Sequence, residues 1–188
     1  MMSLHVTHTN TRARLCCMDH AASSSANDQS TAHNEQGGAR VRLPPPLVFL
    51  ALIIAGVVLE MATGQLELTI ARWPRFLGGG ALASAGLACV LAARAWFTRT
   101  GQHPAPWKPS PELVVRGIYR HTRNPMYLGL TVFQIGLGVA LGNGWIAALA
   151  PLALLTVHVS AVRAEEAYLE EKFGQAYLRY KACVRRYV

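Results

Sequence analysis

The sequence predicts an all-α, polytopic membrane protein, and its composition and its apolar segments both lead to that fold class. Hydrophobic residues make up 52% of the 188 positions and charged residues only 15%, whereas about 25% of residues are charged in an ordinary soluble domain. The apolar residues gather in about four helix-length segments that carry almost no charge. At this length we expect one domain, with its helices packed together in lipid.

Residues 1–42 precede the first apolar segment and differ from the rest of the chain. They are rich in Ser, Thr, Ala, Asn, His and Gln, and they show no apolar period that a helix could bury. They also lack the apolar region of a secretory signal. We therefore expect a disordered tail over 1–42 and a membrane domain over 43–188.

The first two membrane helices are expected over 47–63 and 76–97. The first follows three prolines and has no charge before Glu60. The second contains the small residues Gly80, Ser84 and Gly86, which would let a neighbouring backbone approach closely.

Helices over 127–141 and 145–161 are separated only by Gly142-Asn143-Gly144, a turn that fits an antiparallel helical hairpin. At 1.5 Å per residue each would span roughly 22–26 Å, which is short against a hydrocarbon layer of about 30 Å. We expect a cytosolic helix to continue from the membrane over 162–181.

The charges predict the orientation of this bundle. With four spans, fifteen Lys and Arg residues lie on the side of both termini and only Arg72 and Arg75 on the other. The positive-inside rule then places both termini in the cytosol, in an inner or cytoplasmic membrane. The formal net charge of +8 points to anionic membrane lipid and not to nucleic acid, because the basic residues flank apolar segments. The four cysteines have no metal-ligand spacing, and we expect no metal.

The residues polar enough for chemistry fall in the loop 98–126 and the helix 162–180, so that a site between them would lie at the membrane surface. Along the helix Leu169, Phe173, Ala176 and Tyr180 recur at helical spacing and predict one buried stripe. Glu165 and Glu166 form a carboxylate pair, and His158 lies seven residues before Glu165, on the same face of a regular helix.

The same residues fit simpler interpretations. The loop could be a surface segment with aromatic and basic anchors at the interface, and the helix a solvated amphipathic tail. His158 in an apolar run is a candidate for function, and a hydrogen-bonded structural histidine fits equally well.

Two ordered motifs stand out in these segments. The first is Leu-Val-x-x-Gly-x-Tyr-x-x-x-Arg-Asn-Pro-Met-Tyr-x-Gly at 113–129; the second joins Glu165-Glu166 to Phe173-Gly174-x-x-Tyr177-x-x-Tyr180. Together these motifs resemble the integral-membrane methyltransferases. That superfamily includes isoprenylcysteine carboxyl methyltransferases and phospholipid N-methyltransferases, which use S-adenosylmethionine. The resemblance covers about residues 76–186, and the glycines at 78–80 open a membrane helix and do not form a nucleotide loop.

The resemblance implies an all-α fold with the cofactor S-adenosylmethionine between the loop and the end of the last membrane helix. Carried over by position, the cofactor shell comprises Pro111, Glu112, Leu113, Val114, Tyr119, Asn124, Pro125, Met126, Tyr127 and Glu165. Apolar and aromatic side chains would wall the adenine, and a carboxylate would meet hydroxyl or amino groups. The expected catalytic residues are Tyr127, Glu166 and His158.

Two departures separate the chain from the prenylcysteine branch. Asn124 stands where those enzymes have a His before the Pro, and this form is closer to phospholipid methyltransferases and many bacterial relatives. Ala161 stands where they have an Arg one turn before the first Glu. Arg163 lies about 200° around the helix from that position and cannot replace it.

The sequence therefore predicts methyl transfer from S-adenosylmethionine to a lipophilic or membrane-embedded acceptor, small or lipidated, at a carboxylate, amine or thiol. An amine or thiol must lose a proton, for which His121, His158 or Glu166 could serve. One alternative is a membrane reductase of steroid-reductase type, with Arg116, Arg120 and Arg123 on the 2′-phosphate of NADPH. Another is a non-catalytic membrane protein that binds anionic lipid.

Overall fold

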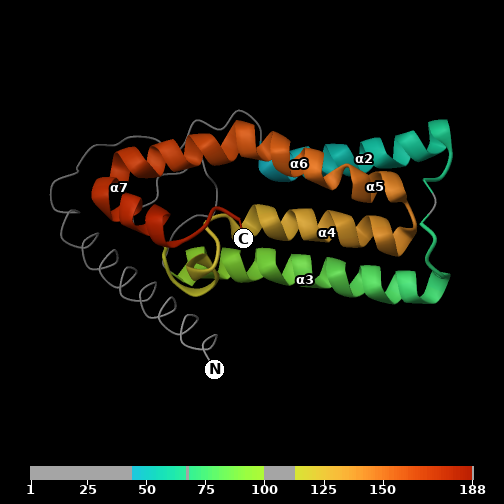
Figure 1. The fold of residues 1–188 in the computed structure, drawn as a ribbon, viewed down its shortest axis with the longest axis horizontal. Coiled ribbons are helices and arrows are strands. Elements are labelled where there is room, and N and C mark those ends of the chain that lie inside the picture. The colour runs from blue at the N-terminus through green and yellow to red at the C-terminus, as the bar shows by residue number, and fades with distance from the viewer. Residues whose placement is uncertain (1–43, 67, 100–112, 188) are drawn as a thin grey trace, which may run out of the picture.

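The computed structural model describes residues 44–66, 68–99 and 113–187. The predicted tail 1–42 and the predicted cofactor residues Pro111 and Glu112 lie outside them. The described residues form helices and connecting turns and include no strand, which confirms the predicted all-α class. Figure 1 shows the long helices running side by side as a bundle, with η1 (Gly117–Arg120), α7 (Arg163–Cys183) and the C-terminus toward one end.

The first two helices, α2 (Pro45–Thr63) and α3 (Arg72–Arg99), are both longer than the sequence suggests. Proline is tolerated in the first turn of a helix because those N–H groups have no partner within the helix. Pro45 and Pro74 therefore lie inside the first turns of α2 and α3. Arg72 and Arg75, which we expected in a loop, belong to α3.

Three described helices are long and apolar enough to cross a membrane: α2, α3 and the continuous helical segment Gly144–Cys183. The fourth apolar helix, α4 (Pro125–Leu141), has 17 residues. The expectation of four spans is therefore met by three to four candidate helices. The charged residues that begin at Arg163 mark the end of the apolar part of the last segment.

The helices α3 and α4 pack closely through glycine. A Cβ placed on Gly86 would lie 2.4 Å from the backbone nitrogen of Phe133, and one on Gly79 would lie 2.3 Å from that of Ala140. We expected Gly80, Ser84 and Gly86 at this interface. The prediction is confirmed for Gly86, whereas Gly80 faces open space and Ser84 is exposed. The residues of α3 that contact α4 here are Gly79 and Ala83, each one position before the expected Gly80 and Ser84.

The helix α4 and the short helices α5 (Gly144–Ala148) and α6 (Ala150–Val157) form the predicted hairpin. Gly142 ends α4 in the left-handed conformation with a φ of 78°, which glycine adopts without strain. Asn143 caps the next helix, because its Oδ1 accepts from the Ile146 N–H at 2.9 Å. The predicted helix 145–161 is interrupted near Pro151, which has no N–H to donate.

The chain then makes one π-helical turn, η2 (His158–Val162), before α7 (Arg163–Cys183) begins. The Arg163 N–H donates to the His158 carbonyl, five residues back. The wider turn holds an extra residue and rotates the residues of α7 by about 100° relative to a regular helix. The expectation that His158 and Glu165 share one face is therefore wrong.

The helix α7 reverses direction at Gly174, whose φ of 49° and ψ of −123° are not helical. Figure 1 shows the two arms of α7 running in opposite directions. The continuous stripe that we predicted is thus broken into two. Its aromatic residues are still buried, because Phe173 and Tyr180 pack with Leu113 and Val115 in one apolar cluster.

Candidate functional site

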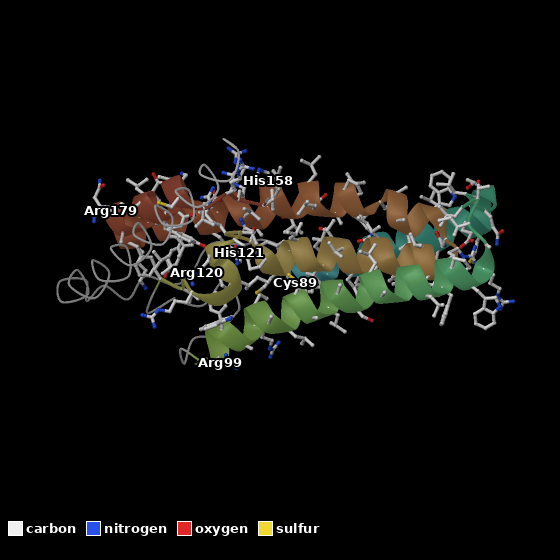
Figure 2. All side chains as sticks on the ribbon, turned by 60° about the horizontal axis from the view of Figure 1, so that its bottom comes forward. Cys89, Arg99, Arg120, His121, His158 and Arg179 are labelled. Carbon is white, nitrogen blue, oxygen red and sulfur yellow. The ribbon has the colours of Figure 1, made fainter. Side chains whose placement is uncertain are left out.

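Four segments meet at one end of the bundle: the 3₁₀ helix η1 (Gly117–Arg120), the first turn of α4, the first turn of α7, and the C-terminal residues 184–187. Figure 1 shows the C-terminus beside the start of α4. Figure 2 places the labelled side chains Arg120, His121 and His158 in this half of the molecule.

Tyr127 and Glu165 form the central contact of this site. The Tyr127 ring is buried in an apolar cluster with residues of α2 and α6, and its hydroxyl donates to Glu165 Oε1 at 2.5 Å. Burial raises the pKa of Glu165 from 4.5 to about 7; the hydrogen bond from Tyr127 opposes this rise, and the charge of Glu166 adds to it. The carboxyl group of Glu165 therefore changes its charge near neutral pH.

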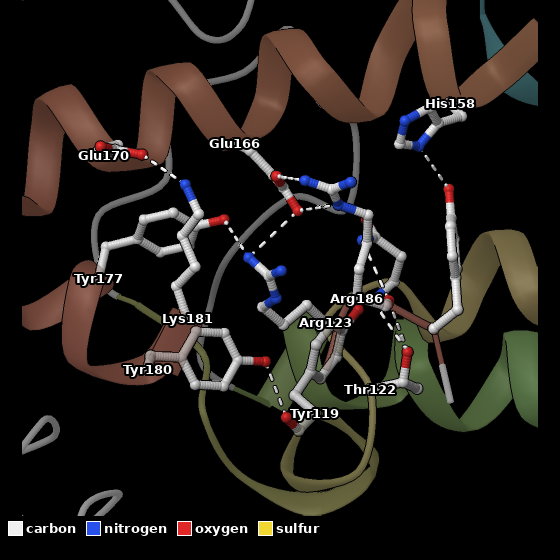
Figure 3. Close-up of polar contacts among 12 residues, drawn as sticks. Tyr119, Thr122, Arg123, His158, Glu166, Glu170, Tyr177, Tyr180, Lys181 and Arg186 are labelled. Atoms are coloured by element: carbon white, nitrogen blue, oxygen red, sulfur yellow. Dashed lines mark hydrogen bonds and ion pairs between the residues drawn. The ribbon is translucent and has the colours of Figure 1, made fainter. Parts of the chain in front are cut away.

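The neighbouring Glu166 is held by two arginines (Figure 3). Arg186 donates from Nε to Oε1 at 2.9 Å and from Nη2 to Oε2 at 2.7 Å, and Arg123 Nη1 lies 3.2 Å from Oε1. Burial alone would raise the pKa of Glu166, but the Arg186 hydrogen bonds and the nearby cations outweigh it and lower that pKa. Glu166 is thus a charged anchor for the C-terminus, which favours a positioning role over the predicted role as a base.

The backbone of the C-terminal residues holds the loop that precedes α4. The Arg185 carbonyl accepts from the Arg123 N–H at 3.1 Å, and the Arg186 carbonyl accepts from Thr122 Oγ1 at 2.9 Å. Asn124, a predicted cofactor residue, donates from Nδ2 to the Arg186 carbonyl at 3.4 Å. The Asn124 amide therefore stabilises the packing of the C-terminal segment against this loop. The C-terminal segment in turn positions the residues that immediately precede Tyr127.

His158 contacts the C-terminal segment and not Glu165. Its Nδ1 lies 2.9 Å from the Tyr187 hydroxyl, and the two ring centroids are 6.0 Å apart. His158 is half-buried at the start of η2 and borders the site through this contact with the C-terminal segment.

The remaining predicted cofactor residues divide into two groups. Tyr119 is buried, stacks edge-on against Phe97 with centroids 5.5 Å apart, and accepts at its carbonyl from the Tyr180 hydroxyl at 2.7 Å. Leu113 and Pro125 are also buried and belong to the packing. Val114 and Met126 keep partial exposure and can still contact a ligand.

Arg186 and Tyr187 were not predicted from the sequence, and Arg123 was given a role only in the reductase alternative, although it stands inside the first motif. The three arginines of the reductase alternative have different surroundings. Arg116 and Arg120 are exposed, whereas the Arg123 side chain is paired with Glu166 and Tyr177.

The side chains at this site fit S-adenosylmethionine by their chemistry. The Glu165 carboxyl and the Tyr127 hydroxyl suit amino and hydroxyl groups, and half-buried Val114 and Met126 supply apolar surface. Arg123 Nε is a buried donor without a hydrogen-bond partner among the described residues, and a ligand carboxylate would satisfy it. No group of three or more His, Cys, Asp or Glu among the described residues could hold a metal ion.

Comparison with known proteins connects this geometry to a family. The chain is 36% identical over 69 residues to the Protein-S-isoprenylcysteine O-methyltransferase of Schizosaccharomyces pombe, an alignment that covers 37% of this chain and 29% of that protein. It is 37% identical over 65 residues to an uncharacterized protein of Haemophilus influenzae, with 34% of this chain and all of that protein covered. The chain thus aligns with less than a third of the yeast enzyme.

The phospholipid methyltransferase family model matches residues 74–176, which extend from the first turn of α3 to just beyond Gly174. The matched region includes Tyr127 and Glu165 and more than half of the sequence. The chain therefore belongs to the phospholipid methyltransferase family of integral membrane proteins.

Proposed function

We propose that this protein transfers a methyl group from S-adenosylmethionine to a lipophilic or membrane-embedded acceptor at the membrane surface. The observation that carries the proposal is the 2.5 Å contact between Tyr127 and Glu165, where the first turns of α4 and α7 meet. It joins the two sequence motifs and lies inside the region that matches the family model.

The proposed roles follow from the surroundings of each side chain. Glu165 binds amino or hydroxyl groups of the cofactor, and Tyr127 orients Glu165 through its hydroxyl. When bound, S-adenosylmethionine supplies an activated methyl group whose leaving group is a neutral thioether. The protein then has to align the acceptor and exclude water, and such alignment contributes several kcal/mol.

A proton must leave if the acceptor is an amine or a thiol. His158 and His121 remain the candidates, because both oxygens of Glu166 are paired with arginines and its pKa is lowered, which makes it a weak base. His158 borders the site and is half-buried, whereas His121 is exposed. We therefore propose His158 as the base, and a carboxylate acceptor would need none.

We further propose a lipid acceptor and not a prenylcysteine. Ala161 is fully buried in the cluster that holds Tyr127, so the position that carries an arginine in prenylcysteine enzymes has no cation here. Arg163 is exposed and does not compensate. We place the enzyme in an inner or cytoplasmic membrane with both termini in the cytosol, where the acceptor enters laterally from lipid.

The first experiment is the binding of radiolabelled S-adenosylmethionine to detergent-purified protein, with NADPH as competitor. The wild type is compared with Glu165→Ala and with the matched control Glu171→Ala, which removes an exposed carboxylate of the same helix. We expect saturable binding in the wild type and the control, loss of at least about tenfold in affinity in Glu165→Ala, and no displacement by NADPH.

Three results would contradict the proposal. Folded wild-type protein that binds no S-adenosylmethionine would exclude the methyltransferase mechanism, and displacement by NADPH would favour a reductase. If Glu165→Ala and Tyr127→Phe both leave every ligand affinity unchanged, a non-catalytic lipid-binding protein becomes the better interpretation.

A further inference from the structure

A cleft lies at the end of the bundle opposite to Tyr127 and Glu165. It has a volume of about 560 Å³ and lies between the first turns of α3 and the last residues of α4. Its lining consists of Arg72, Trp73, Arg75, Phe76, Ala140 and Leu141. The methyl-transfer site uses none of these residues.

The cleft concentrates positive charge that the described residues leave unneutralised. Arg72 and Arg75 stand one helical turn apart, and neither forms an ion pair with a described residue. Arg75 Nε is buried and lacks a hydrogen-bond acceptor among the described residues. Two guanidinium groups at this spacing repel each other, so that an anion shared between them would be stabilising.

Arg75 is held in place by close packing against the end of α4. A Cβ on Gly142 would lie 2.3 Å from Arg75 Nη1, which shows how closely the guanidinium covers this glycine. The negative end of the α4 dipole faces the same region and helps to tolerate the charge. The site is thus built by the fold and is more than a pair of exposed arginines.

The aromatic residues of this cleft indicate that it lies at the level of the lipid headgroups. Trp73 is 74% exposed and Phe76 is 58% exposed, near the start of α3, a helix that is apolar enough to cross a membrane. Trp145 lies at the same end and donates from Nε1 to the Gly64 carbonyl at 3.2 Å. Tryptophan with an anchored N–H is typical of the membrane interface.

We propose that this cleft binds the phosphodiester headgroup of an anionic membrane phospholipid, with Arg72 and Arg75 on the phosphate and Trp73 and Phe76 against the glycerol and acyl region. Paired arginines match the charge of a phosphate, and the exposed aromatic rings match its lipid part. The site is distinct from the proposed methyl-transfer site and does not depend on that function.

The test measures binding of phosphatidylglycerol and phosphatidylcholine to purified protein in detergent, by native mass spectrometry and by the shift in thermal unfolding. The double variant Arg72→Gln/Arg75→Gln is compared with Arg94→Gln, which removes an exposed arginine of the same helix. We expect the double variant to bind phosphatidylglycerol roughly 30-fold more weakly. Binding of phosphatidylcholine and of S-adenosylmethionine should stay as in the wild type.

Three results would overturn the proposal. The first is equal phosphatidylglycerol affinity in the wild type and the double variant. The second is stabilisation by inorganic phosphate as strong as that by phosphatidylglycerol, which would make the cleft a site for free anions. The third concerns Glu67, which lies outside the described residues: binding only in Glu67→Gln would show that this carboxylate already occupies the arginines.

Discussion

Arg186 binds both carboxylate oxygens of Glu166, at 2.9 and 2.7 Å, and so fastens the C-terminus to the first turn of α7. The same residue accepts from Thr122 and Asn124 at its carbonyl. One C-terminal residue thus connects the loop before Tyr127 to the helix that carries Glu165, and it does so with both its side chain and its backbone.

This connection predicts that Arg186→Ala destabilises the folded protein. The variant leaves the buried Glu166 with Arg123 alone, and the loss of hydrogen bonds to a charged group costs about 1 to 3 kcal/mol. Thermal unfolding in detergent measures the effect. Arg185→Ala is the control, because its side chain is exposed and only its carbonyl is used. Equal unfolding midpoints for the two variants would contradict the prediction.

The two glutamates predict opposite responses of the cofactor-free protein to pH. Burial raises the pKa of Glu165 to about 7, so the folded state binds this proton more tightly than the unfolded state and stability falls as the pH rises from about 4.5 to 7. The pKa of Glu166 is lowered, so its contribution is present above the ordinary glutamate pKa and is lost as the pH falls below about 4.

The variant Glu165→Gln separates these two contributions. It should flatten the dependence of the unfolding midpoint on pH between about 5 and 7 and leave the loss of stability in acid unchanged. A slope in the neutral range that is the same in Glu165→Gln and in the wild type would show that another group titrates there.

We expect the substitution Gly174→Ala to destabilise the protein through backbone conformation alone. Alanine at a φ of 49° and a ψ of −123° costs about 1 to 3 kcal/mol, although a Cβ there would meet nothing within 4 Å. Gly78→Ala is the matched control, because a Cβ there also meets open space but the backbone is helical. Thermal unfolding should show a lower midpoint for Gly174→Ala only. A loss in both variants would point to a requirement for glycine in general.

We expect the substitution Gly86→Ala to destabilise the packing between α3 and α4 instead. A Cβ at this position would lie 2.4 Å from the Phe133 nitrogen and 2.6 Å from the Gly129 carbonyl, so that α3 and α4 must separate to accept it. We expect Gly86→Ala to lose about 1 to 3 kcal/mol. Gly80→Ala, on the open side of α3, should keep the stability of the wild type. Thermal unfolding of both variants in the same detergent decides whether this contact between α3 and α4 is correct.

The sequence predicted the membrane helices because lipid requires long apolar segments to satisfy their backbone hydrogen bonds within a helix. It did not predict the reversal at Gly174, since glycine occurs both within helices and at their ends. The choice depends on distant contacts, in which Phe173 and Tyr180 pack with Leu113. The ion pair between Arg186 and Glu166 was missed for the same reason, because Arg186 returns to Glu166 only after the chain reverses.

Within the site, the motifs identified Tyr127 and Glu165, and the structure places these two in contact. The predicted relationship of His158 to Glu165 failed at η2, because the composition of the segment His158–Val162 gives no signal for a π turn. The motifs also predicted Asn124 and Leu113 as cofactor residues. In the structure Asn124 bonds to the C-terminal segment and Leu113 packs against α7, and these distant partners are not evident from the sequence.

The contact between Tyr127 and Glu165 predicts coupling between these residues in cofactor binding. In a double-mutant cycle of Tyr127→Phe and Glu165→Gln, each change should weaken S-adenosylmethionine affinity, and the double variant should lose less than the sum by about 1 kcal/mol or more. Radioligand binding and thermal unfolding are measured on the same samples. Coupling in stability without coupling in affinity would mean that the pair only fastens α4 to α7, whereas coupling in affinity requires the pair to act on the bound cofactor.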